Sequence, residues 1–239
     1  MRLTEKSAII VLSSFTLSGL IIIGINGVYN ASDAQNIKRF NGVDASLFLK
    51  NEDGEPLFLP TKNGQINLNI ASTFNEEEKI LIEKGIRELD FVAKGLEYNY
   101  QSPSGNYISI MPFSNVDKAQ EDASYTFGRA TFHHHDCSME ITYPIKITLH
   151  QELLQQYPTE VYSLVVKHEL LHTLGFRDLY DNEDAQQLMY YAVTGNDMSE
   201  KEIETLNKVY AENYTGLVTT IKPHSLLYIP QKEEEVLEN

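Results

Sequence analysis

Cysteine is almost absent from this chain, since Cys137 is the only one among 239 residues. A single thiol excludes an intrachain disulfide bond, and it also excludes a zinc site built on C-x-x-C pairs. Any metal ion that the protein binds must therefore be held by histidine and carboxylate side chains.

Basic residues are also scarce. Lysine and arginine number 19 against 34 aspartates and glutamates, which gives a formal net charge of −15 at pH 7. No basic stripe offsets this charge, so a nucleic-acid partner is disfavoured, and an anionic membrane surface would repel the folded part of the chain. Apolar residues still make up 42% of the sequence, which is enough for the packed core of one domain with appendages.

A long uncharged stretch stands near the N-terminus. Residues 8–25 are rich in isoleucine, leucine and valine, and Arg2 and Lys6 precede them. This order is typical of an export signal, and the small residues Ser32 and Ala34 predict cleavage after Ala34. Because the stretch nearly has the length needed to span a bilayer, residues 1–34 are expected to be a signal peptide or an uncleaved anchor. Both readings place the rest of the chain outside the cytoplasm, secreted or anchored in the membrane by this segment alone; a buried N-terminal helix is a third reading.

Apolar periodicity predicts strands and helices along the remaining chain. Strands are expected at 65–70, 107–111, 125–132, 139–143 and 145–149, and helices at 76–94, 159–174 and 200–214. Two of the helices have N-terminal capping signals, because Asn75 precedes a run of glutamates and Ser199 with Glu202 forms a capping box.

A hairpin is expected before the first of these strands. Residues 46–49 and 57–59 are apolar and flank the turn-forming tetrad 51–54. This hairpin belongs either to a short pro-segment or to the first sheet. The predicted organisation is therefore a linker, hairpin or pro-segment at 35–64, a main domain at 65–214, and an acidic tail at 215–239.

The second long helix carries the motif H-E-x-x-H, as His168-Glu169-Leu170-Leu171-His172. Four residues advance a helix by a little more than one turn, so both imidazoles leave one face and can reach the same Zn²⁺. Glu169 lies beside the first histidine, where a carboxylate can act as the general base of a metallopeptidase. The apolar residues before the motif predict a buried, rigid helix.

A catalytic zinc site needs a third protein ligand and an open position. Gly175 ends the helix and can turn the chain sharply. Asp178 follows three residues later. Alternatively, the third ligand could be a glutamate of the later helix, as in thermolysin-like proteins; the candidates are Glu200, Glu202 and Glu204.

The string from His168 to Asp178 resembles the metzincin clan of zinc endopeptidases, whose pattern is H-E-x-x-H-x-x-G-x-x-H. Aspartate stands here in the last position, as in the snapalysin type, and a carboxylate is an acceptable zinc ligand. The resemblance covers about residues 65–214, and only the zinc string and the later methionine are specific.

The resemblance implies an α+β, zincin-like fold. It comprises a twisted mixed β-sheet, two long helices, and a small C-terminal subdomain that ends in a third helix. It also implies one catalytic Zn²⁺ held by His168, His172 and Asp178, with Glu169 as the general base.

Three further roles follow from the resemblance. Met189 would form the methionine turn beneath the metal, and Tyr191 would stabilise the oxyanion, with Tyr190 as the competing candidate. The strand that contains Gly128, Arg129 and Ala130 would be the edge that binds a peptide substrate.

The implied activity is hydrolysis of peptide bonds in protein or peptide substrates by a monomeric enzyme. Two alternatives stay open: a zinc metallo-aminopeptidase, and a non-catalytic zinc-binding protein of the cell surface. The histidines at 133–135 are expected in a polar connection between strands, and Cys137 as a free thiol of the core. A Ca²⁺ ion has no support, because the acidic residues at 181–184 lack the spacing of a calcium loop.

Overall fold

The computed structural model describes residues 39–100, 105–113, 126–192 and 195–211. Its centre is a five-stranded mixed sheet in the order β2-β1-β3-β5-β4, formed by β1 (Gln65–Ile70), β2 (Glu97–Asn99), β3 (Ile108–Pro112), β4 (Gly128–His134) and β5 (Ile141–Leu149). The first four strands of that order are mutually parallel, and β4 pairs antiparallel with β5 at the edge. The expected mixed sheet is therefore present.

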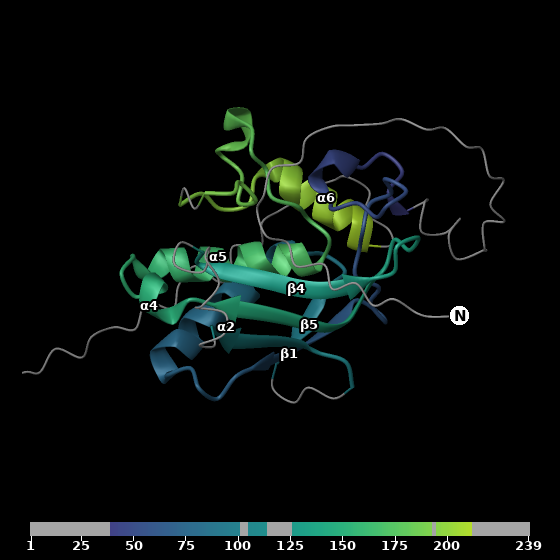
Figure 1. The fold of residues 1–239 in the computed structure, drawn as a ribbon. Coiled ribbons are helices and arrows are strands. Elements are labelled where there is room, and N and C mark those ends of the chain that lie inside the picture. The colour runs from purple at the N-terminus through teal and green to yellow at the C-terminus, as the bar shows by residue number, and fades with distance from the viewer. Residues whose placement is uncertain (1–38, 101–104, 114–125, 193–194, 212–239) are drawn as a thin grey trace, which may run out of the picture.

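Two long helices lie together against the sheet. They are α2 (Glu76–Val92) and α5 (Thr159–Thr173), and both lie behind the sheet in the view of Figure 1. Alternate strand residues such as Ile66, Ile110 and Ile147 are fully buried, as expected for a sheet that packs one face against helices. The helices end close to the predicted positions.

The helix α2 begins with the predicted cap. Asn75 accepts a hydrogen bond from the backbone N–H of Glu78, and the Glu78 side chain accepts one from the N–H of Asn75. Helix α6 (Glu200–Tyr210) has the same reciprocal arrangement between Ser199 and Glu202. Both capping boxes satisfy backbone donors that a helix N-terminus otherwise leaves unpaired.

Helix α6 and the first described residues, which include Arg39 and Asp44, lie side by side above α5 (Figure 1). Arg39 donates a hydrogen bond to the carbonyl of Val209, and Lys201 pairs with Asp44 at 2.8 Å. The hydroxyl of Tyr210 donates to the carbonyl of Leu174 and accepts from the N–H of Leu59. The last described helix thus joins the first described residues, from Arg39 to Leu59, to the end of α5.

The strands predicted at 139–143 and 145–149 are one strand, β5, and this prediction was wrong. Pro144 lies between the two predicted segments, and proline cannot donate to a ladder. In the structure Pro144 stands just before the pairing with β3 begins, and beside the shifted register between Thr131 and His133 of β4. The strand therefore passes through the proline where the missing N–H leaves no ladder position unfilled.

The histidine run is also placed differently from the prediction. Strand β4 extends to His134, and His133 pairs with Thr142 of β5, so these two residues lie in a strand rather than in a connection. Cys137 is exposed and not a thiol of the core. Strand β2 and a short helix α4 (Gln151–Leu154) were not predicted, since each is too short to show a period.

The hairpin at 46–59 is present, and most of its apolar side chains are buried. A short 3₁₀ helix η1 (Ala45–Leu47) leads into it, and the N–H of Leu57 donates a hydrogen bond to the carbonyl of Leu49 across the turn. Phe48 and Phe58 are each only 1% exposed, so the hairpin is part of the core. It does not join the five-stranded sheet as a named strand, although Phe58 forms an isolated bridge with Glu140.

The chain ends differ from the predicted boundaries or lie outside the described residues. Helix α6 ends at Tyr210, before the predicted residue 214, and Ala211 is extended. Among the described residues, no helix is both long and apolar enough to span a bilayer. The predicted signal or anchor at 1–34 and the predicted tail at 215–239 lie outside the described residues.

Candidate metal centre

The end of α5 explains how three potential ligands meet. The N–H of Gly175 donates to the carbonyl of His172 at 3.0 Å, and the N–H of Phe176 donates to that of Leu171 at 3.1 Å. These two bonds form the Schellman ending of a helix, which requires a left-handed residue, and Gly175 has φ +102°. The chain therefore doubles back directly after His172.

The N-terminal hairpin holds this turn from outside. The N–H of Leu49 donates to the carbonyl of Gly175 at 2.7 Å, and the N–H of Arg177 donates to that of Leu47 at 3.0 Å. The rings of Phe48 and Phe176 lie 4.6 Å apart. A side chain at Gly175 would strike the carbonyl of Leu57, so this glycine is required for space as well as for its conformation.

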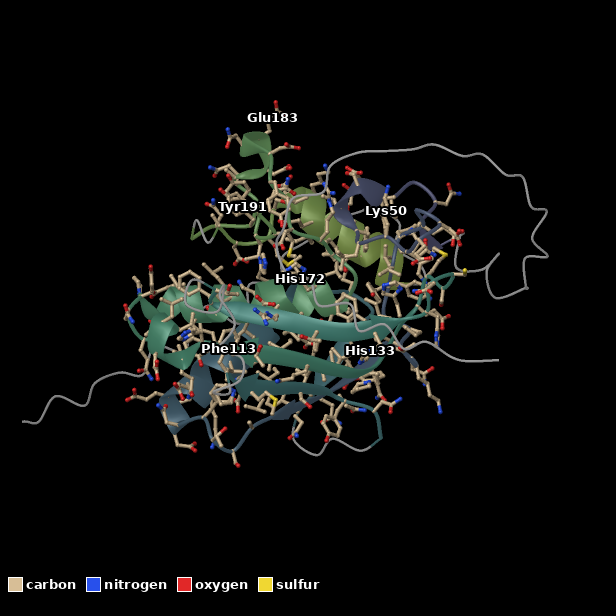
Figure 2. All side chains as sticks on the ribbon, in the orientation of Figure 1. Lys50, Phe113, His133, His172, Glu183 and Tyr191 are labelled. Atoms are coloured by element: carbon tan, nitrogen blue, oxygen red, sulfur yellow. The ribbon has the colours of Figure 1, made fainter. Side chains whose placement is uncertain are left out.

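The result is a cluster of three ligand atoms, here called the metal cluster: Nε2 of His168, Nε2 of His172 and Oδ1 of Asp178. The two nitrogens are 3.1 Å apart, and Asp178 lies 3.2 Å from His168 and 3.4 Å from His172. Among the described residues, this is the one group of three or more histidines, cysteines and acids that could hold a metal ion. His172 lies between β4 and the segment that carries Tyr191 (Figure 2).

These distances fit a tetrahedral zinc ion. With metal–ligand bonds of roughly 2.0–2.1 Å, two ligand atoms at the corners of a tetrahedron stand about 3.3 Å apart. All three separations in the metal cluster lie near this value. His168, His172 and Asp178 could thus hold Zn²⁺ without a change in their positions.

Backbone carbonyls orient both imidazoles. Nδ1 of His168 lies 2.9 Å from the carbonyl oxygen of Leu188, and Nδ1 of His172 lies 2.9 Å from that of Phe176. Because a carbonyl only accepts, each Nδ1 must carry the proton, which leaves Nε2 of the neutral ring free for a metal.

Without a metal ion, Asp178 favours a proton on His172. Burial alone would lower the pKa of His172, but hydrogen bonding and charge from Asp178 outweigh it and raise that pKa to about 9. Burial would likewise raise the pKa of Asp178, yet the hydrogen bonds from the two histidines lower it well below the usual range. A proton therefore substitutes for part of the charge that a cation would supply.

Glu169 lies beside the metal cluster on the same helix. It is 5% exposed, and burial raises the pKa of its carboxyl group. The backbone N–H of Ala130 in β4 donates a hydrogen bond to the carboxylate, whereas the buried oxygen Oε2 has no hydrogen-bond partner among the described residues. This open acceptor is what a group needs if it is to take a proton from a third molecule.

The segment after Asp178 supports the metal cluster. Met189 is 1% exposed, and its neighbour Leu188 provides the carbonyl that orients His168. Glu202 of α6 accepts hydrogen bonds from the backbone N–H groups of Leu188 and Met189, at 3.2 and 2.8 Å. Because Glu202 is fully buried and occupied by these bonds, it does not serve as the alternative third ligand.

The predicted tyrosine is not the one that contacts a ligand. Tyr191 is 52% exposed, and its ring stacks on Tyr180 at 5.3 Å. Tyr180, which the sequence analysis missed, has a side-chain hydrogen bond with Asp178, and burial together with that carboxylate raises its pKa to about 12. Its position two residues after Asp178 was the only signal in the sequence. Tyr190 packs on Tyr191 at 4.8 Å.

The strand predicted to bind substrate is at the edge of the sheet. Gly128, Arg129 and Ala130 all belong to β4, which is paired on one side by β5. Two of these residues also touch Glu169, a relationship that the sequence did not indicate.

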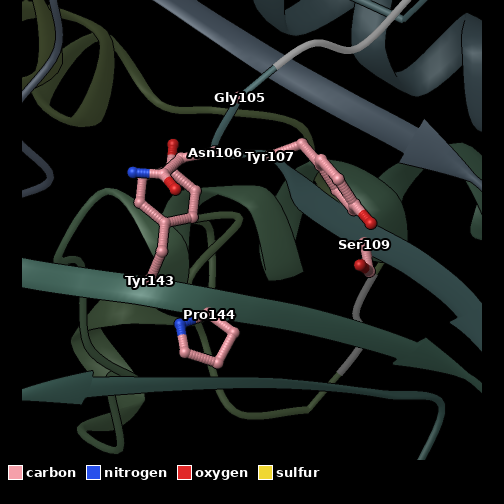
Figure 3. A pocket seen from close by; sticks show the side chains of 6 residues that line it. All are labelled: Gly105, Asn106, Tyr107, Ser109, Tyr143 and Pro144. Atoms are coloured by element: carbon pink, nitrogen blue, oxygen red, sulfur yellow. The ribbon is translucent and has the colours of Figure 1, made fainter.

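A separate pocket of about 340 Å³ lies on β3 and β5, as Figure 3 shows. Its lining contains no histidine and no carboxylate, and it includes none of the predicted site residues; it is formed by Gly105, Asn106, Tyr107, Ser109, Tyr143 and Pro144. The chemistry that the sequence predicts therefore lies elsewhere, at the metal cluster.

No protein-family model matches the sequence, and no curated protein matches it. Solved structures that are similar in shape include the following two. High choriolytic enzyme 1, a hatching enzyme zinc-protease from the medaka fish Oryzias latipes, has a TM-score of 0.39 and 15% identity, over 70% of this chain and 96% of its own. The GM1-bound form of the ECX AB5 holotoxin has a TM-score of 0.42 and 11% identity, over 68% of this chain and 87% of its own. Scores and identities this low establish neither a family nor an activity for this chain.

Proposed function

We propose that this protein is a zinc-dependent endopeptidase of the metzincin type, with His168, His172 and Asp178 as the metal ligands. The observation that carries the proposal is the metal cluster itself, where three ligand atoms 3.1–3.4 Å apart stand beside a buried carboxylate. When bound there, Zn²⁺ would supply a Lewis acid that polarises a carbonyl group and lowers the pKa of water.

Glu169 is the general base in this proposal. Its carboxylate is held by the N–H of Ala130, and its Oε2 is open to accept a proton. Burial raises the pKa of Glu169, which suits a group that takes a proton from water and later gives it to the leaving amine. A protein that only stored zinc would need no buried base, so this residue favours catalysis over simple binding.

The edge strand β4 would align a peptide substrate. An extended peptide can add to an edge strand through main-chain hydrogen bonds, and β4, the edge strand of the described sheet, runs past Glu169. A tyrosine hydroxyl would donate a hydrogen bond to the developing oxyanion; Tyr191 and Tyr180 are the two candidates. The substrate is a protein or peptide, and the enzyme acts as a secreted or membrane-anchored monomer.

The variant Glu169→Gln tests this function. It preserves the shape of the side chain but removes the base, so digestion of an unfolded protein should fall by about 10²- to 10⁴-fold. Zinc content, measured by elemental analysis, should stay at the wild-type level. Full activity in this variant, or full activity of the wild type after chelation, would refute the proposal.

Peptides with blocked termini separate an endopeptidase from an aminopeptidase. An endopeptidase cleaves an N-acetylated peptide at the same rate as the free one, because it does not bind the terminal amine. If acetylation abolishes cleavage, the alternative assignment as a zinc metallo-aminopeptidase is correct.

A further inference from the structure

Gly128 is the first residue of β4, and it lies directly against the side chain of Glu169. A Cβ atom added at this glycine would stand 2.7 Å from both Cγ and Oε1 of Glu169, and 2.9 Å from its Cδ. All three nearest atoms belong to that one side chain. Because carbon atoms do not approach so closely, a side chain at position 128 must displace the carboxylate or the strand.

The requirement for glycine at this position is one of space alone. Gly175 and six other described glycines have positive φ angles, which favour glycine for conformational reasons. Gly128 is not among them, and it pairs with Leu149 as an ordinary strand residue. An alanine could adopt its backbone conformation, so contact with Glu169 is what disfavours any larger residue.

Glu169 has little room to move away. Its side chain is 5% exposed, and the residues that follow it in α5, Leu170 and Leu171, are fully buried. On the strand side, the N–H of Ala130 donates to the carboxylate. The carboxylate is therefore held between the backbone of β4 and the metal cluster.

We propose that Gly128 is a positioning residue for Glu169: its missing side chain lets the backbone of β4 hold the carboxylate in its working position. The inference rests on the proposed function, because it gives Glu169 the role of general base. It assigns to Gly128 a task other than direct contact with substrate, and it assigns to the N–H of Ala130 the task of fixing one carboxylate oxygen so that Oε2 stays open.

The variant Gly128→Ala tests the catalytic part. A displacement of about 1 Å can reduce turnover by about 100-fold, so kcat should fall by about that factor. KM should change little, and zinc content should not change, because neither the ligands nor the outer edge of β4 is altered. Unchanged kcat would overturn the proposal; so would a rise in KM with kcat retained, which would indicate a role in substrate binding.

A double-mutant cycle in thermal stability tests the contact without reference to activity. Gly128→Ala should lower Tm in the wild type and in Glu169→Gln, which keeps a side chain of the same shape. It should lower Tm less in Glu169→Ala, where the atoms in conflict are gone. The cycle remains informative if Gly128→Ala alone fails to fold. The double variant Gly128→Ala, Glu169→Ala should then recover a folded state. Equal losses of Tm in all backgrounds would overturn the proposal.

Gly85→Ala is the matched control. A Cβ at this glycine of α2 would stand 2.7 Å from the carbonyl of Ser163 and 3.0 Å from Val166, both in α5. Its loss of Tm should be the same whichever residue occupies position 169, and kcat per folded molecule should be retained. If the chain proves not to be a peptidase, the stability cycle still reports on the contact, so the two failures are distinguishable.

Discussion

The carbonyl oxygen of Leu188 accepts a hydrogen bond from Nδ1 of His168, at 2.9 Å. These residues are 20 positions apart in sequence, and the bond turns the imidazole so that Nε2 faces Asp178. The segment that follows Asp178 thus sets the orientation of His168, and backbone carbonyls commonly orient metal-binding histidines in this way.

Asp178→Ala should reduce the zinc content of the purified protein. The substitution leaves only two of the three converging ligands, and the two histidines lose the carboxylate that lies 3.2 and 3.4 Å from them. Elemental analysis after dialysis measures the effect. Asp178→His, which restores the commoner metzincin pattern, should retain zinc. If Asp178→Ala keeps wild-type stoichiometry, Asp178 is not a ligand.

The stability of the metal-free protein should fall as the solution becomes more alkaline. The pKa of His172 is raised from 6.5 to about 9 in the folded state, chiefly by Asp178 acting against the effect of burial. A group whose folded-state pKa is raised stabilises the protein fully below its unfolded pKa, and this stabilisation is lost as pH rises through the folded value. Tm of the chelated protein should therefore decrease between about pH 6 and about pH 9.

Zinc should remove that pH dependence, because both histidines must be neutral to bind the metal. Binding near neutral pH should then release a proton, and calorimetry in buffers with different ionisation enthalpies measures it. Asp178→Asn provides the control, since it removes the charge that raises the pKa of His172. Persistence of the full alkaline loss in this variant would contradict the assignment to the His172–Asp178 pair.

Glu202→Ala should weaken both the fold and the metal site. Glu202 accepts hydrogen bonds from the backbone N–H groups of Leu188, Met189 and Ser199, and from the Ser199 hydroxyl. Leaving buried donors unpaired costs about 1–3 kcal/mol, and disturbance of the residues that support metal ligands lowers affinity by about 10-fold or more. Denaturant unfolding and zinc titration measure the two effects.

The control is Glu204→Ala on the same helix. Glu204 is exposed and forms a surface pair with Lys208 at 2.8 Å, and such pairs contribute about 0–1 kcal/mol. Its removal should leave zinc affinity unchanged. Equal effects of the two substitutions would mean that the bonds of Glu202 do not support the metal site.

A pair of tyrosine variants should distinguish the candidates for the oxyanion donor. Tyr180 bonds to Asp178, and Tyr191 stacks on Tyr180. Loss of one oxyanion donor lowers kcat by about 10²- to 10³-fold, so whichever tyrosine acts in this way should show that loss on change to phenylalanine. Because Phe keeps the ring, the other variant should retain its stacking and its kcat. Full activity in both variants would exclude Tyr180 and Tyr191 from this role and leave Tyr190 as the remaining candidate.

Much of the fold follows from local patterns in the sequence. Helix α2 has a capping box at Asn75, and α5 stands between Pro158 and Gly175, so both helices are confirmed within a few residues. The two strands that were predicted wrongly or missed, β5 and β2, are instead determined by the strands that pair with them. The path of β5 through Pro144 is decided by the register of its two neighbours, and β2 exists because residues 97–99 reach the free side of β1.

For the candidate site too, the sequence predicted some features and not others. The spacing of His168, His172 and Asp178 predicted the cluster that the structure brings together, because one helix and one tight turn determine it. The approach of Gly128 to Glu169, and the support of Leu188 and Met189 by Glu202, join segments far apart in sequence. No periodicity records such contacts, so only the folded arrangement reveals them.

The hairpin at residues 46–59 has a consequence for how the protein could mature. Backbone hydrogen bonds with Leu47 and Leu49 hold the residues on both sides of Phe176, which lies two residues before Asp178. Excision of everything before residue 64 would remove this clamp and leave Phe176 without its ring partner. Cleavage at that point would therefore remove support from the metal cluster and would not activate the protein. Cleavage after Ala34 would leave the hairpin intact.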